Sequence, residues 1–180
     1  MGVLGMGPIG VETARLAEHF GMNAIGMRRT VTGYEQCETW TFDRLDELLG
    51  MVDDLVLALP LTDDTRHLIG ARELSLMRPG ARLVNVGRGD LIDEPAMIYA
   101  LLSGQLGGAG LDVMSTEPLP DDSPLWDMPN VILTPHHSSD TPMTTVRVNE
   151  LFLENLRRWL AGDQLHNEVD IDVAARPTSR

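Results

Sequence analysis

Short apolar runs alternate with longer amphipathic stretches along most of this 180-residue chain. Several runs, such as "LVLALP", are continuously apolar, which is typical of strands buried on both faces of a sheet. We expect strands at Met1–Leu4, Asn23–Met27, Leu55–Leu59, Arg82–Val86, Gly108–Val113 and Val131–Leu133. The intervening stretches predict helices at Ile9–Phe20, Phe42–Leu49, Ala71–Met77 and Glu94–Ser103, and a long one at Thr144–Leu160. Such alternation predicts an α/β fold with a doubly wound parallel sheet of the Rossmann type.

The charge balance narrows the range of partners. The chain carries 27 acidic against 14 basic residues, a net charge of −13, which argues against nucleic acid or a membrane surface as partner. The single Cys37 excludes an internal disulfide and a cysteine-rich metal site, so we expect no metal. No apolar run approaches the roughly 20 residues of a membrane helix, and the N-terminus does not read as a signal peptide. We expect a soluble, cytoplasmic protein.

A glycine-rich turn follows the first expected strand. Gly5, Gly7 and Gly10 form the pattern G-x-G-x-x-G, with Pro8 and Ile9 at the start of the next helix. In a βαβ unit this pattern provides a tight turn, close approach of the backbone to a pyrophosphate and close packing of helix on strand. The turn therefore predicts a dinucleotide site, with a purely structural turn as the alternative.

The end of the second expected strand favours a phosphorylated ribose. NAD-binding domains usually place an acidic residue there, about 20 residues after the turn, to bind the ribose hydroxyls. This chain has "GMRRT", in which Arg28, Arg29 and Thr30 offer two guanidiniums and a hydroxyl. Those groups suit a phosphate better than a diol, so we predict a preference for NADP(H), with NAD as the alternative cofactor. The alternative is that Arg28 and Arg29 are ordinary solvated surface residues with no role in cofactor binding.

The second half of the chain carries a succession of motifs. "DDLVLALPLTDDTRHLIG" is followed by "LMRPGARLVNVGRGDLIDEPAMIYALLSGQLGGAGLDVMSTEPLP" and then by "SPLWDMPNVILTPHHSSDT". From about Met1 to Asp170 the chain closely resembles the D-isomer-specific 2-hydroxyacid dehydrogenases, which include glyoxylate/hydroxypyruvate reductases and phosphoglycerate dehydrogenases. The resemblance implies hydride transfer between NADP(H) and a D-2-hydroxy acid/2-oxo acid pair.

The resemblance also implies three catalytic residues. Arg88 in "VGRGD" matches the family's substrate arginine, whose planar fork can hold a carboxylate and polarise the neighbouring carbonyl. His136 in "TPH" matches the acid/base, and Glu117 in "STEPLP" matches the carboxylate that pairs with that histidine. His137, which directly follows His136, is the rival for the acid/base role.

Further cofactor contacts are implied by the same resemblance. Leu59 and Pro60 would line the adenine side, Thr65 would reach the phosphates, and Asp112 in "GLDV" would approach the nicotinamide amide. The remaining expected contacts, in the loops after two later strands, are Val86, Gly87, Ser138 and Ser139.

Family members have two domains, and this chain would supply only one. We expect an NAD(P)-binding domain over residues 1–162, including the long helix, and a tail over 163–180 that would return to a largely missing substrate domain. Met1 stands where a valine would be natural, so a misread start codon, a true truncation and a deliberately cut chain are all open. Without the substrate domain we expect weak NADP(H) binding and little turnover.

Two alternatives to the enzyme stay open: a non-catalytic dinucleotide-binding interaction module and a gene fragment. By analogy we expect a homodimer. The long helix carries an apolar stripe at helical spacing, formed by Val148, Leu151, Phe152, Leu156 and Trp159. This stripe would form part of the dimer surface together with the loop Pro118–Pro129, or it would pack on the chain's own sheet.

Overall fold

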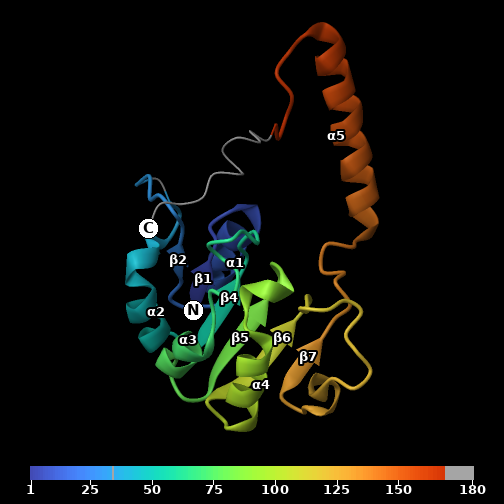
Figure 1. The fold of residues 1–180 in the computed structure, drawn as a ribbon. Coiled ribbons are helices and arrows are strands. Elements are labelled where there is room, and N and C mark those ends of the chain that lie inside the picture. The colour runs from blue at the N-terminus through green and yellow to red at the C-terminus, as the bar shows by residue number, and fades with distance from the viewer. Residues whose placement is uncertain (34, 169–180) are drawn as a thin grey trace. The chain divides into compact units, whose positions relative to one another are not determined.

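Seven parallel strands form one sheet in the computed structural model, which describes residues 1–33 and 35–168. The strand order is β3-β2-β1-β4-β5-β6-β7. Figure 1 labels the six strands from β2 to β7 in this order. Every neighbouring pair in this order is parallel, which confirms the predicted Rossmann-type sheet. The sheet belongs to the first of two compact units, Met1–Pro135, and the second unit is His136–Arg180.

Six of the strands lie where the apolar runs predicted them, with ends that differ by at most two residues. The strand that the sequence reading missed is β3, Glu38–Trp40, at one edge of the sheet. Its three residues include a single buried apolar side chain, Trp40, so it carries almost no periodic signal. The strands are β1 Gly2–Leu4, β2 Ile25–Met27, β3 Glu38–Trp40, β4 Asp54–Leu57, β5 Ala81–Asn85, β6 Leu106–Leu111 and β7 Val131–Leu133.

The helices also follow the prediction closely. The expected helix at Phe42–Leu49 is a short 3-10 turn, Phe42–Arg44, followed by α2. The long helix α5 starts at Pro142, which suits a first helical turn, and is capped after Ala161 by Gly162 in the left-handed conformation. The helices are α1 Pro8–His19, α2 Leu45–Met51, α3 Ala71–Leu76, α4 Glu94–Leu102 and α5 Pro142–Ala161.

Two apolar clusters cover the two faces of the sheet, because neighbouring residues of a strand point to opposite sides. Leu55 and Leu57 of β4 pack in a large cluster that contains buried residues of α2, α3 and α4. Val56, between them, belongs to a smaller cluster with Ala14 and Ala17 of α1. Continuous apolar strands are therefore needed here, and the sheet is doubly wound as predicted.

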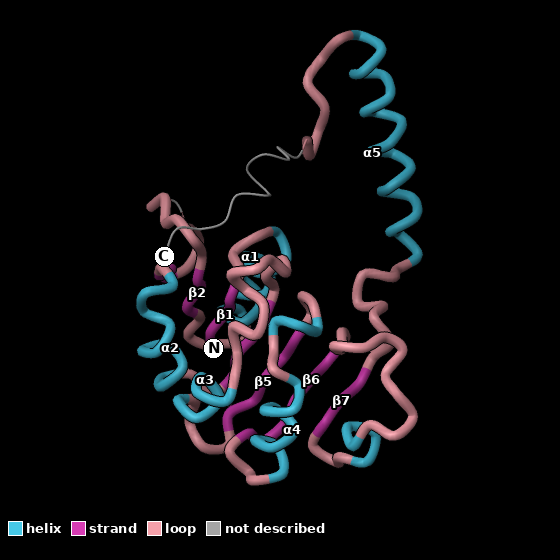
Figure 2. The backbone as a smooth tube through the Cα atoms, in the orientation of Figure 1, coloured by secondary structure: helices cyan, strands magenta, loops and turns pink. Residues whose placement is uncertain are grey.

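The chain reverses its direction along the sheet at β1. From β1 it moves outward to β2 and β3, then returns to place β4 on the other side of β1. The loops after β1 and β4 consequently diverge at the carboxyl edge of the sheet, and such a switch point is where open α/β sheets bind ligands. Figure 2 shows these loops at one end of the strands.

The second unit is described up to residue 168 and consists mainly of α5. Asn155 ties the following segment back to the helix, since its side chain makes hydrogen bonds of 2.8 and 3.1 Å with the backbone of His166. The described part of this unit leaves Val148, Phe152 and Trp159 of α5 more than half exposed. The two explanations for the apolar stripe, a homodimer surface and packing on the sheet, both remain open. The predicted tail beyond residue 168 lies outside the described residues.

None of the described helices combines enough length and apolar character to cross a membrane.

Leu57 provides a test of the core. It is fully buried in central strand β4, so Leu57→Ala should lower the free energy of unfolding by about 2–5 kcal/mol. The matched control is Leu102→Ala at the end of α4, where the side chain is 72% exposed and little stability should be lost. Urea unfolding followed by circular dichroism measures both variants, and equal losses would contradict this core.

Candidate functional site

A cavity of about 320 Å³ lies at the switch point of the sheet. Its walls come from the start of α1 and from the loops after β4 and β5. Six of the sequence-predicted site residues line it together, five of them expected at the cofactor and one, Arg88, at the substrate. The lining residues are Ile9, Ala58, Leu59, Pro60, Leu61, Val86, Gly87 and Arg88.

The glycine-rich turn shapes one side of this region by close packing. A Cβ on Gly10 would lie 1.8 Å from the carbonyl oxygen of Gly5, so only glycine lets the first turn of α1 approach β1. Gly7 is exposed, and a Cβ there would meet nothing within 4 Å. The outer side of the turn is therefore open to a ligand group.

The first turn of α1 suits an anion. The first N–H groups of a helix have no partner within it, and they carry partial positive charge. No acidic residue occupies that turn. Together with the open side at Gly7, these features fit a pyrophosphate as the motif predicts.

The segment after β2 holds the three residues predicted at a phosphate. Arg28 is half-buried, whereas Arg29 and Thr30 are exposed. The Nη1 group of Arg28 donates to the carboxylate of Glu35 at 3.2 Å. Sequence reasoning missed Glu35, which lies seven positions beyond Arg28, outside the place where an acidic residue is expected.

Glu35 is held by its own loop. Its carboxylate accepts from the backbone N–H of Thr32 at 2.6 Å, the Thr32 hydroxyl at 2.8 Å and the N–H of Gly33 at 2.7 Å. These donors, first among them the Thr32 N–H, lower the pKa of Glu35 to about 2. The carboxylate is therefore ionised at neutral pH.

Asn85, a second residue that the sequence reading missed, shapes the turn that presents Arg88. Its amide donates to the carbonyl of Arg88 at 2.8 Å and accepts from the N–H of Gly87 at 3.0 Å. The side chain is 1% exposed, at the end of β5. The asparagine in "VNVGRG" could have suggested this role only through its position at a strand end.

The loop of Glu117 packs against the turn of Arg88. A Cβ on Gly89 would lie 2.0 Å from the carbonyl group of Met114, so the two loops touch backbone to backbone. Glu117 accepts from the N–H of Met114 at 3.0 Å, which holds its carboxylate to this loop. The structure thus brings together the loops that carry two of the three predicted catalytic residues.

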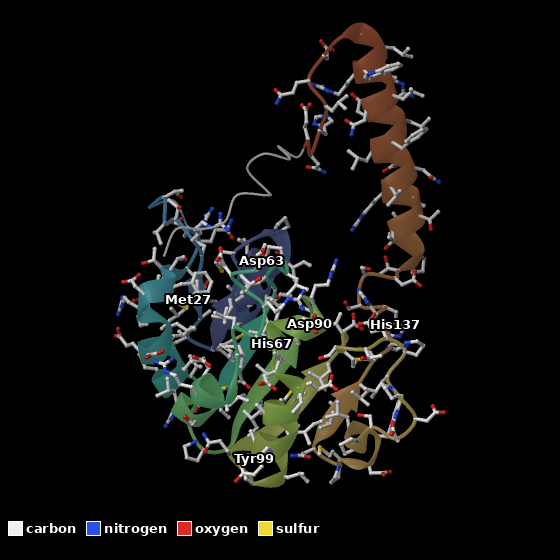
Figure 3. All side chains as sticks on the ribbon, in the orientation of Figure 1. Met27, Asp63, His67, Asp90, Tyr99 and His137 are labelled. Carbon is white, nitrogen blue, oxygen red and sulfur yellow. The ribbon has the colours of Figure 1, made fainter. Side chains whose placement is uncertain are left out.

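The loop after β4 is fastened to the same turn. Arg66 forms an ion pair with Asp90, and the N–H of His67 donates to the carbonyl of Asp90 at 2.7 Å. Figure 3 shows His67 and Asp90 near each other on these loops. Ile69 and Ile92 add a parallel bridge, so the two loops at the cavity are joined by backbone as well as side-chain contacts.

Thr65 and Asp112 make contacts within the protein. The hydroxyl of Thr65 donates to the carbonyl of Pro60 at 2.8 Å and accepts from the N–H of Thr62 at 2.8 Å. Asp112, 4% exposed after β6, accepts from the hydroxyl of Thr134 at 2.6 Å. Their proposed contacts with phosphate and nicotinamide stay predictions.

His136, His137, Ser138 and Ser139 belong to the second unit. His136 has a φ of 53°, in the left-handed region that residues other than glycine rarely adopt. Such backbone strain tends to occur at functional sites. The meeting of His136 with Arg88 and Glu117 stays a prediction, because His136 belongs to one unit and the other two residues belong to the other.

Among the described residues, no group of three or more histidine, cysteine or acidic side chains is placed to hold a metal ion.

A glycine-rich turn at a helix N-terminus, beside a cavity at the switch point of a parallel sheet, defines a dinucleotide-binding domain of the Rossmann class. The family can be stated more narrowly. The chain belongs to the D-isomer specific 2-hydroxyacid dehydrogenases, since the model of their NAD binding domain matches residues 1–138.

Among curated proteins, the chain is 43% identical over 176 residues to glyoxylate/hydroxypyruvate reductase B of Pectobacterium carotovorum, covering 96% of this chain and 55% of that protein. The reductase B of Citrobacter koseri is 41% identical over 177 residues, with 97% and 54% covered. The chain spans about half the length of the curated relatives it matches.

Solved structures of the same family superpose closely on this chain. A D-isomer specific 2-hydroxyacid dehydrogenase from Xanthobacter autotrophicus Py2, in complex with NADPH and MES, superposes with a TM-score of 0.87 at 39% identity, covering 94% of this chain and 70% of that one. An NADPH-dependent glyoxylate/hydroxypyruvate reductase from Sinorhizobium meliloti, in complex with NADP and sulfate, gives 0.88 at 36% identity, with 97% and 56% covered.

The two hydrogen bonds of Asn85 to Arg88 and Gly87, which we call the Asn85 clamp, can be tested by mutation. Asn85→Ala should lower the free energy of unfolding by about 1–3 kcal/mol, because it leaves the buried N–H of Gly87 without an acceptor. Asn130→Ala is the control, since Asn130 is exposed and its amide makes only a 3.4 Å hydrogen bond. Urea titration of the purified chain measures both, and a similar small loss in each would refute the clamp.

Proposed function

We propose that this chain forms the cofactor-binding part of an NADP-dependent oxidoreductase, which transfers a hydride between NADP(H) and a D-2-hydroxy acid/2-oxo acid pair such as glyoxylate or hydroxypyruvate. The observation that carries this proposal is Arg88 in the wall of the same cavity as Ile9 and Leu59. A cation for a carboxylate and a dinucleotide site are thereby adjacent. A cytoplasmic location is part of the proposal.

Arg28, Arg29 and Thr30 would bind the 2′-phosphate of the cofactor. The end of β2 carries no carboxylate, and two guanidiniums there favour a phosphate over a ribose diol. The Xanthobacter and Sinorhizobium structures, which hold NADPH and NADP, support this preference. The first turn of α1 and Gly7 would receive the pyrophosphate.

The substrate would be bound and polarised by Arg88. Its guanidinium can hold the carboxylate of a 2-oxo acid with two parallel hydrogen bonds and draw electron density from the neighbouring carbonyl. The Asn85 clamp fixes the turn that presents this side chain. When bound, NADPH supplies the hydride for the carbonyl carbon.

His136 would exchange the proton. It donates to the carbonyl oxygen during reduction and takes the proton back from the hydroxyl during oxidation, for which an imidazole is suited at neutral pH. Glu117 would orient the ring and favour its charged form. A non-catalytic binding module has no use for these three residues, which favours the enzyme.

A steady-state assay tests the reaction on the longest in-frame product of the gene, by following NADPH oxidation with glyoxylate or hydroxypyruvate. His136→Asn should lower kcat by about 10²–10⁴-fold, because the general acid is lost. His137→Asn is the matched control and should keep near wild-type kcat.

Arg88→Gln should raise KM for the 2-oxo acid and also lower kcat, because the guanidinium both holds the carboxylate and polarises the carbonyl, while KM for NADPH should stay nearly unchanged. If the protein binds NADPH yet oxidises none with either acid, the binding module is the better assignment. A larger loss in His137→Asn than in His136→Asn would move the acid/base role to His137.

We also propose that α5 contributes to a homodimer. Val148, Phe152 and Trp159 form an apolar stripe that the described part of their unit leaves exposed. A second copy is a suitable partner, because homodimer interfaces are more apolar than ordinary surfaces.

Phe152→Glu should therefore convert a dimer into a monomer, since it would place a charge without a partner in the interface. Light scattering after size exclusion measures the mass. Glu150→Gln, which lies on the same helix and removes a charge, should leave the mass unchanged. A monomeric wild-type chain would instead favour packing of the stripe on the sheet.

A further inference from the structure

Glu35 is an acidic residue inside a segment that is proposed to bind a phosphate. Its side chain is 7% exposed, although Thr32 and Gly33, which precede it in the same loop, are exposed. A carboxylate near a phosphate normally weakens binding by repulsion. Its presence there needs an explanation.

The contacts of Glu35 show that its charge is used within the loop. Oε1 accepts from the N–H and hydroxyl of Thr32 and from Nη1 of Arg28, while Oε2 accepts from the N–H of Gly33. Both oxygens are therefore engaged by protein donors. This arrangement differs from that of the acidic residue that binds ribose hydroxyls in NAD-dependent domains, which must present its oxygens to the ligand.

The ion pair with Arg28 leaves most of that guanidinium's capacity for a ligand. The contact is one-pronged, at 3.2 Å, and the Arg28 side chain is 38% exposed. A guanidinium carries five N–H donors in a fixed fork. One of them directed at Glu35 fixes the side chain, and the others can still bind a phosphate.

We infer that Glu35 is a positioning residue for the 2′-phosphate end of the cofactor. It closes the turn at Thr32 and Gly33 and holds Arg28 in place, so that Arg28, Arg29 and Thr30 form a preorganised phosphate site. Preorganisation raises affinity because less side-chain and loop entropy is lost on binding. The inference rests on the NADP preference proposed above.

A positioning role and a purely electrostatic role predict opposite results. Arg28, Arg29 and Glu35 together carry a net charge of +1 (two positive, one negative), and Glu35→Gln would raise it to +2. If only charge mattered, the variant would bind a phosphate more tightly. If Glu35 orders the site, binding weakens, because the glutamine amide has one acceptor oxygen and can accept from Thr32 or from Gly33 but not from both.

The experiment is titration calorimetry of the 180-residue chain with 2′,5′-ADP and with 5′-AMP, which differ only in the 2′-phosphate. The wild-type chain should bind 2′,5′-ADP about tenfold or more tightly than 5′-AMP, because the 2′-phosphate can accept charge-assisted hydrogen bonds from the arginines. Glu35→Gln should lower the affinity for 2′,5′-ADP about fivefold or more and change the affinity for 5′-AMP less than about twofold. Glu47→Gln is the matched control, because Glu47 pairs with Arg44 on the surface and both affinities should persist.

The outcomes separate the two proposals. A wild-type chain that does not distinguish the two nucleotides overturns the NADP preference itself. A wild-type chain that does distinguish them, with equal or tighter 2′,5′-ADP binding in Glu35→Gln, overturns only the role of Glu35. Should circular dichroism show Glu35→Gln to be unfolded, Thr32→Val removes one donor to the same carboxylate. Thr32→Val should lower the affinity for 2′,5′-ADP about twofold, and an unchanged affinity would then overturn the inference.

Discussion

The contact of Gly10 with the carbonyl of Gly5 is the constraint on which the site depends. It lets the first turn of α1 approach the end of β1, so that the free N–H groups of the helix lie at the switch point of the sheet. Any side chain at position 10 would push the helix away from the strand. The start of α1 also forms part of the cavity wall, so displacement of the helix would change the proposed pyrophosphate site and the cavity together.

A second set of constraints acts at the end of β5 and in the turn that follows it. Asn85 closes the turn of Arg88, Gly89 lets that turn touch the loop of Glu117, and Asp90 fastens the loop after β4. These contacts join loops from three strands at one edge of the sheet. Glu35 does the same on a smaller scale after β2, where a buried carboxylate orders a segment of exposed donors. At each site a polar side chain, Asn85 or Glu35, holds backbone groups of its loop. The arginine of that loop can still bind a ligand.

Much of the fold was predictable, because continuous apolar runs and helical periodicity reflect burial directly. The sequence reading missed β3, since Glu38–Trp40 lies at an edge and buries little. At the site, the glycine motif and Arg88 were predicted by pattern. Asn85 and Glu35 were not, because an asparagine or glutamate acquires such a role only from the N–H groups that the fold brings to it.

The sequence by itself determined the class of the sheet, the dinucleotide turn and the family, since these depend on local spacing and on motifs that survive in linear order. Tertiary structure alone decided which loops meet: that the turn of Arg88 lies on the loop of Glu117, and that Glu35 turns inward to its own backbone. The physical reason is that hydrogen bonds and close backbone contacts depend on distances between residues far apart in the chain, or on the path of a loop, and neither leaves a periodic pattern in the sequence.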